Sequence, residues 1–168
     1  MMEASDLLAR RRPLERKYSA NPASAQVVFR SRGRVDPEGV ACRVETGQGI
    51  TVTGLHRATG GTGADRSAED MLLEALVGCA GVTLKAIAAR EGIVLDDAQI
   101  EAEGDLDFRG SLGIADDAPV GFSAIRLVFR IASDADDATL DALIAATRAR
   151  CVVFQTLTCV PEIVVARA

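Results

Sequence analysis

Four cysteines are the residues of this chain whose side chains could carry redox chemistry: Cys42, Cys79, Cys151 and Cys159. A thiolate can be oxidised to a sulfenic acid, and a second thiol can then convert the sulfenic acid into a disulfide. Cys79 lies inside an apolar helical segment and Cys151 opens a second apolar segment much later in the chain. The pair suits two-step thiol chemistry, although a cysteine in an apolar helix is more often a packing residue.

The sequence context separates the four thiols further. Cys151 is expected in the first turn of a helix, where free N–H groups favour a thiolate, and Arg148 and Arg150 add positive charge. Cys42, inside a predicted strand, and Cys159, just before a proline, are expected to be structural residues.

Other kinds of catalytic site have little support. The chain has one histidine, His56, which is expected to be a solvated loop residue, so Ser-His or Cys-His catalysis is not indicated. The cysteine spacing is not that of a zinc site, and no metal is expected. The glycine-rich segment 60–63 lacks the Lys-Ser/Thr ending of a phosphate-binding loop, which favours a flexible loop near a site.

Composition restricts the partners and the compartment. The 168 residues carry a net charge of −5, with no Trp and one Tyr, which argues against binding to nucleic acid or an anionic membrane. We expect no membrane-spanning segment and no signal peptide, and therefore a cytoplasmic protein. In that reducing compartment a permanent disulfide framework is not expected.

The order of the predicted elements indicates an α+β fold. We predict an N-terminal arm, 1–25, with a helix interrupted at Pro13, followed by a single domain, 26–168. Predicted strands cover 26–30, 39–45, 49–53, 98–108, 122–132 and 161–166, and predicted helices cover 68–90 and 134–148. Ser67 should cap the helix 68–90, and Gly92 should end it. Since this helix is apolar on nearly every face, a partner subunit is expected to cover part of it.

The stretch 69–79, EDMLLEALVGC, resembles the central-helix motif of the OsmC/Ohr family, the osmotically inducible and organic hydroperoxide resistance proteins. Further matching segments follow in the family's order at 104–110, 119–122, 125–129 and 151–157, so that the resemblance spans 26–168. The resemblance implies an OsmC-like fold, in which antiparallel strands wrap long central helices in an intertwined homodimer. It also implies thiol-dependent reduction of organic hydroperoxides with an external dithiol as reductant and no cofactor.

The same resemblance assigns roles to individual residues. Cys79 matches the peroxidatic cysteine, Cys151 the resolving cysteine, and Glu69 the motif glutamate. Arg34 is the best match for the catalytic arginine of the family, with Arg32 as the alternative. Ten residues of helix rise about 15 Å, so Glu69 and Cys79 of one continuous helix cannot touch. Either a bend intervenes, or the other subunit supplies the glutamate.

Two departures from the Ohr pattern favour the broader OsmC-like branch. Ala68 stands where a proline often precedes the motif glutamate, and Arg148 and Val152 stand where a histidine and a proline accompany the second cysteine. A non-enzymatic OsmC-fold protein that binds an apolar ligand or acts as a redox switch is the alternative function. A thiol hydrolase or acyl carrier is a weaker alternative, because no general base is placed.

Overall fold

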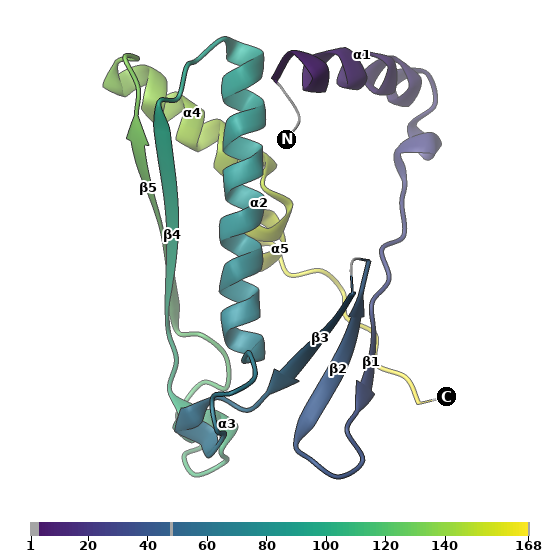
Figure 1. Ribbon diagram of the computed structural model, residues 1–168, viewed down its shortest axis with the longest axis vertical. Coiled ribbons are helices and arrows are strands. Elements are labelled where there is room, and N and C mark those ends of the chain that lie inside the picture. Colours follow the sequence, from purple (N-terminus) through teal and green to yellow (C-terminus); the bar gives the residue numbers. More distant parts are fainter. Residues whose placement is uncertain (1–3, 48, 168) are drawn as a thin grey trace. The chain divides into compact units, whose positions relative to one another are not determined.

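The computed structural model describes residues 4–47 and 49–167, apart from the side chains of Ala4 and Ser5. The helices are α1 (Ala4–Ala20), α2 (Ala68–Glu91), α3 (Phe108–Ser111), α4 (Asp137–Arg150) and α5 (Val152–Thr158), with 3-10 turns η1 (Pro22–Ala25) and η2 (Arg57–Thr59). The strands are β1 (Arg32–Val35), β2 (Ala41–Thr46), β3 (Gly49–Gly54), β4 (Asp97–Asp105) and β5 (Ala124–Ala132). This element order, drawn in Figure 1, confirms the predicted α+β class.

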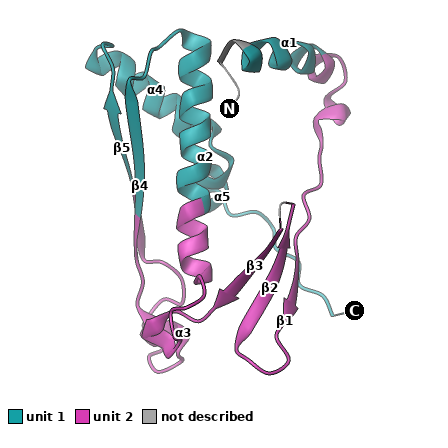
Figure 2. Cartoon of the chain, in the orientation of Figure 1, with its two compact units in different colours: residues 1–16, 75–102, 127–168 teal, residues 17–74, 103–126 magenta. Residues whose placement is uncertain are grey.

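The chain divides into two compact units, which Figure 2 shows in different colours. Unit 1 comprises Met1–Arg16, Ala75–Ala102 and Leu127–Ala168, and unit 2 comprises Lys17–Glu74 and Glu103–Arg126. The predicted division into an arm, 1–25, and one domain, 26–168, follows different boundaries and stays a prediction.

The strands form two antiparallel sheets. β1, β2 and β3 make a meander in that order, with Arg34 opposite Arg43 and Thr46 opposite Gly49. β4 pairs with β5 in a second sheet, and its antiparallel direction follows from backbone bonds at both ends. The N–H of Asp96 donates to the carbonyl of Ala132, and the N–H of Ser123 donates to the carbonyl of Asp105.

The ends of α2 follow from local chemistry. The hydroxyl of Ser67 accepts the N–H of Asp70 at 3.1 Å and donates to its carboxylate at 2.8 Å, which caps the first turn. Gly92, with φ +72°, takes the left-handed conformation that ends a helix. The predicted start and stop of α2 are thereby confirmed, and the helix is continuous between them.

The core of unit 1 lies where α2 and α4 bury their apolar faces. Leu84, Ile87, Ala88 and Leu143 form a buried cluster. Residues from the β4–β5 hairpin pack against it, together with apolar residues before β4: Ile93, Leu95, Ala98, Ile100, Phe129 and Ile131. The opposite side of α2 stays open in the single chain, since Val82 is 70% exposed.

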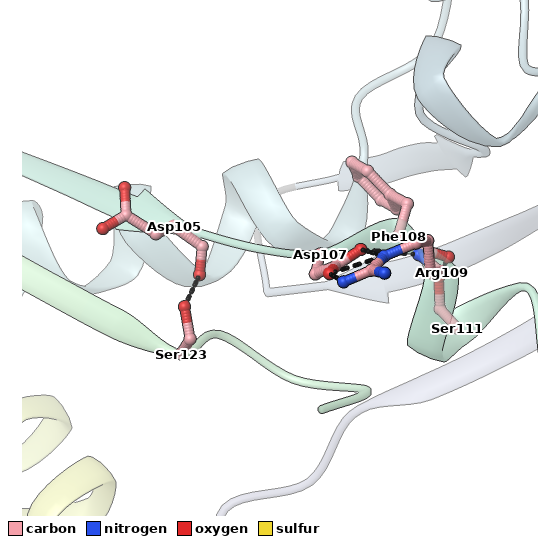
Figure 3. A network of polar contacts seen from close by, with 6 residues as sticks. All are labelled: Asp105, Asp107, Phe108, Arg109, Ser111 and Ser123. Carbon is pink, nitrogen blue, oxygen red and sulfur yellow. Dashed lines mark hydrogen bonds and ion pairs between the residues drawn. The ribbon is translucent and has the colours of Figure 1, made fainter. Parts of the chain in front are cut away.

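A polar network holds the turn that follows β4 in unit 2 (Figure 3). Asp107 caps α3 by accepting the N–H of Arg109 at 3.0 Å, and it also pairs with the guanidinium of that residue. The Ser123 hydroxyl donates to the carbonyl of Asp105 at 3.1 Å. The connection between β4 and β5 therefore contains a short capped helix, α3.

Some expectations were wrong. Residues 26–30 and 161–166 are not strands, and Val28 and Val165 are 71% and 90% exposed. Their apolar residues favour strands, but the single chain offers these segments no strand partner. α1 continues through Pro13, which leaves the carbonyl of Ala9, an exposed residue, without its helical donor.

The expectation that no segment is long and apolar enough to cross a membrane was also wrong. α2 meets both criteria by length and composition alone. Core helices of soluble proteins meet the same criteria, and the cluster around Leu84 buries part of α2 within unit 1.

Candidate functional site

Unit 1 brings Cys79 and Cys151 together, as the sequence predicted. Cys79 is half-buried on α2, and Cys151 is 1% exposed between α4 and α5. Both are free thiols, and they lie close enough for each to shift the pKa of the other. Two thiols from distant parts of the chain therefore share one site.

The turn between α4 and α5 positions Cys151. Its N–H ends α4 by donating to the carbonyl of Thr147 at 2.8 Å, and its carbonyl begins α5 by accepting the N–H of Gln155 at 2.9 Å. The side-chain amide of Gln155 also donates to the Arg148 carbonyl at 2.9 Å. These bonds satisfy backbone groups that helix ends leave free, and they fix the direction in which α5 starts.

The start of α5 stabilises the thiolate of Cys79. Burial acts to raise the pKa of this thiol, but hydrogen bonds from the N–H of Val153, the thiol of Cys151 and the N–H of Val152 outweigh it. The hydroxyl of Thr83 acts in the same direction, and the pKa of Cys79 lies below its ordinary value. N–H groups in the first turn of a helix have this effect on a thiolate wherever they face it.

Cys151 shows the opposite shift. Burial raises its pKa, the N–H groups of Phe154 and Val153 offset this in part, and the neighbouring Cys79 raises it further. The helix start therefore acts on Cys151 in the expected direction, but burial and the neighbouring Cys79 outweigh it, so the net shift of the pKa is upward. The first turn of α5 also lowers the pKa of Cys79, so the thiolate is favoured at Cys79 and the protonated thiol at Cys151.

An arginine and an aromatic ring lie beside this turn. The guanidinium carbon of Arg148 lies 5.4 Å from the centroid of the Phe154 ring, a cation–π contact. Arg148 is exposed and Phe154 is half-buried. The contact ties the last turn of α4 to α5, which supports the placement of Cys151.

Glu69 and Arg34 lie in unit 2. Glu69 is half-buried in the first turn of α2 and lines a cavity of about 510 Å³, together with Cys42 and the apolar side chains of Val35 and Leu55. Arg34 is exposed on β1, as is Arg32. Glu69 and Cys79 lie on one helix that is continuous from Ala68 to Glu91.

The other candidate residues have structural roles. His56 lies in a loop as expected but is half-buried: its Nδ1 accepts the N–H of Ala58 at 3.1 Å, and its ring stacks on Phe108 with centroids 5.1 Å apart. In the glycine-rich loop, a Cβ at Gly61 would lie 1.8 Å from the Leu55 carbonyl oxygen, so backbone packing accounts for that glycine.

The remaining cysteines differ in their exposure. Cys42 is half-buried in β2, close against Gly33, and Cys159 is exposed at the end of α5. Over 4–47 and 49–167, no group of three or more His, Cys, Asp or Glu side chains is placed to hold a metal ion.

Comparison with known proteins places this arrangement in a known fold. Residues 61–166 match a family described as OsmC-like protein. No curated protein sequence matches the chain significantly. The fold resembles an OsmC-like protein from Mycoplasma pneumoniae, with a TM-score of 0.67 and 16% identity, covering 80% of this chain and 90% of that one.

Two further solved structures carry functional names. The organic hydroperoxide resistance protein OsmC from Legionella pneumophila gives a TM-score of 0.61 at 18% identity, covering 79% of this chain and 91% of that one. The organic hydroperoxide resistance protein OhrB of Bacillus subtilis gives 0.53 at 19% identity, covering 80% and 93%. At these identities the likeness establishes the fold.

Proposed function

The chain belongs to the OsmC-like protein family, and from this premise we propose that it is a cysteine-based peroxidase that reduces organic hydroperoxides. The observation that supports the proposal most directly is the closeness of two thiols whose pKa values are shifted in opposite directions. The pKa of Cys79 is lowered and that of Cys151 is raised. The names of the Legionella and Bacillus neighbours agree with such an activity.

The first step uses the thiolate of Cys79. Its sulfur attacks the distal oxygen of the hydroperoxide, so that an S–O bond forms and the O–O bond breaks. The alkoxide leaves with a proton from solvent as an alcohol, and Cys79 becomes a sulfenic acid. A lowered pKa favours this step because the thiolate is the nucleophile.

The second step uses the protonated thiol of Cys151. Its sulfur displaces the sulfenic oxygen, an S–S bond joins Cys79 to Cys151, and the oxygen leaves as water with the Cys151 proton. An external dithiol then reduces the disulfide by thiol–disulfide exchange. These steps use no metal or organic cofactor, and the reducing cytoplasm would supply the dithiol.

We assign Glu69 and Arg34 to the same chemistry in a homodimer. The arginine would favour the thiolate by charge, and the glutamate would hold the arginine. Glu69 lies ten residues before Cys79 on a continuous helix, about 15 Å along its axis, which is too far for a shared site within one α2. A two-fold dimer would supply both residues to the thiol pair of the other subunit.

Exposed apolar segments support a dimer. Phe29 is 92% exposed and Val165 is 90% exposed, each in a segment that has no strand partner in the described chain. Within the described residues β1 also pairs with β2 alone, which leaves an open sheet edge. A second subunit could pair with these segments and cover Val82 on α2, and light scattering on the full chain would measure the resulting mass.

The peroxidase is tested by mapping the oxidation product. Reduced protein is treated with cumene hydroperoxide, alkylated, and digested without reductant for mass spectrometry. We expect a Cys79–Cys151 disulfide, no peroxide consumption by Cys79→Ser, and wild-type consumption by the matched control Cys159→Ser. If Cys79 stays a thiol in excess peroxide, the peroxidase is excluded and a non-enzymatic role of the fold is favoured.

A further inference from the structure

α5 is a short helix with little burial of its own to hold it in place. It runs from Val152 to Thr158, and none of its residues is buried. The residues that follow it, 159–167, form no helix or strand. Among the described helices and strands, α4 is its main neighbour. A helix this short is marginal in isolation, so contacts with α4 must fix the direction in which α5 runs.

Gln155 supplies a hydrogen bond between the two helices. α4 ends at Arg150, and Cys151 is extended, with ψ 110°, so the N–H of Val152 belongs to α5. In a continuous helix that N–H would bond the carbonyl of Arg148. The side-chain amide of Gln155 takes its place and donates to this carbonyl at 2.9 Å. A side chain of α5 therefore satisfies a carbonyl that the end of α4 leaves free.

This hydrogen bond closes the chain around Cys151. The N–H of Cys151 donates to the carbonyl of Thr147 at 2.8 Å, and its carbonyl accepts the N–H of Gln155 at 2.9 Å. The bond from Gln155 to Arg148 joins the residues on either side of these two bonds. Inside this ring of bonds the Cys151 side chain is 1% exposed. Loss of the amide donor would leave α5 freer to turn about Cys151 and open its thiol to solvent.

We propose that Gln155 is a positioning residue, whose amide holds α5 on the last turn of α4 and thereby keeps the Cys151 thiol buried in a fixed place. The role depends on a donor, so a side chain that only accepts hydrogen bonds cannot fill it. In the proposed peroxidase this hold would speed the second step, because the Cys151 sulfur must meet the Cys79 sulfenic acid in a defined geometry. That consequence rests on the proposed function, whereas the hold on the turn does not.

The test measures how often the turn opens, from the rate at which iodoacetamide labels Cys151 in the reduced protein. A buried thiol reacts only when it opens to solvent, so the rate follows the population of the open state. Tandem mass spectrometry distinguishes Cys151 from Cys159. Gln155→Met keeps an unbranched side chain without a donor, and Gln155→Glu repeats the loss with a side chain of the same shape. Gln155→Lys keeps a donor, and high salt screens its added charge.

We expect Cys151 to be labelled about three- to tenfold faster in Gln155→Met and Gln155→Glu, which is the range for one lost hydrogen bond. Gln155→Lys should follow the wild type, and Cys42 in unit 2 should keep its rate in every variant. An unchanged rate in both donor-free variants, an equal acceleration in Gln155→Lys, or an equal acceleration at Cys42 would overturn the proposal. Because labelling needs no peroxide, faster labelling of Cys151 in a protein whose Cys79 stays a thiol in excess peroxide would reject the proposed function and keep the role of Gln155.

Discussion

A proline at position 152 should remove one of the hydrogen bonds that lower the pKa of Cys79 while leaving α5 in place. Val152 is the first residue of α5, where the backbone N–H has no partner within the helix and proline is well tolerated. Its side chain is 71% exposed. The residue before it, Cys151, has φ −74° and ψ 110°, a conformation that a following proline favours.

The size of the effect follows from the type of bond that is lost. Hydrogen bonds to charged groups contribute about 1.5–3 kcal/mol, and the lower end applies because sulfur is a weak acceptor. The N–H of Val153, which lowers the pKa more than that of Val152, is retained. One pKa unit corresponds to about 1.4 kcal/mol, so we expect Val152→Pro to raise the pKa of Cys79 by about one unit.

The assay is the alkylation rate of Cys79 as a function of pH. Below the wild-type pKa, the thiolate fraction of Val152→Pro should be about tenfold smaller, and above both pKa values the two rates should converge. Val152→Ala keeps the N–H and removes most of the side chain, so it should follow the wild type. A Val152→Pro profile that matches the wild type, with the helical content of the protein intact, would refute the role assigned to the start of α5.

Three further substitutions test other parts of the argument. Cys151→Ser should let peroxide convert Cys79 to a sulfenic acid that persists, and labelling with dimedone would detect it; a rapid return of the Cys79 thiol without added reductant would contradict the resolving role of Cys151. Leu84→Ala should lower the free energy of unfolding by about 2–5 kcal/mol, because Leu84 is 1% exposed, and urea denaturation would measure the loss. Gly104→Ala should cost about 1–3 kcal/mol, since its Cβ would lie 2.5 Å from the Phe122 ring; an unchanged melting temperature would show that the ring moves freely.

Local chemistry explains which parts of the fold the sequence could predict. The ends of α2 depend on Ser67, Asp70 and Gly92, which act within a few residues of one another. The strands β2 and β3 have turn residues on both sides and a neighbour close in sequence. Two segments, 26–30 and 161–166, have the composition of strands. A strand also needs a neighbouring strand to pair with, and composition does not reveal whether the chain provides one.

The sequence also predicted only part of the candidate site. The resemblance to a known family predicted the pair Cys79 and Cys151, which the structure brings into contact. Sequence position suggested that the helix start would favour a thiolate at Cys151. The N–H groups there act on both sulfurs, but burial and the neighbouring Cys79 leave the pKa of Cys151 raised, whereas that of Cys79 is lowered. The balance at each sulfur depends on the packing between α2 and α5, which sequence position does not reveal.

The opposite pKa shifts of the two thiols are linked by one geometry. N–H groups of the first turn of α5 lower the pKa of both thiols, but Cys151, directly before that turn, is the more deeply buried. Burial and the neighbouring Cys79 raise the pKa of Cys151, and the Cys151 thiol helps to lower the pKa of Cys79. A peroxidase needs this asymmetry, because the first step requires a thiolate and the second releases water that carries the proton of the resolving thiol. If both thiols had lowered pKa values, they would repel one another as thiolates and the second step would need another proton donor.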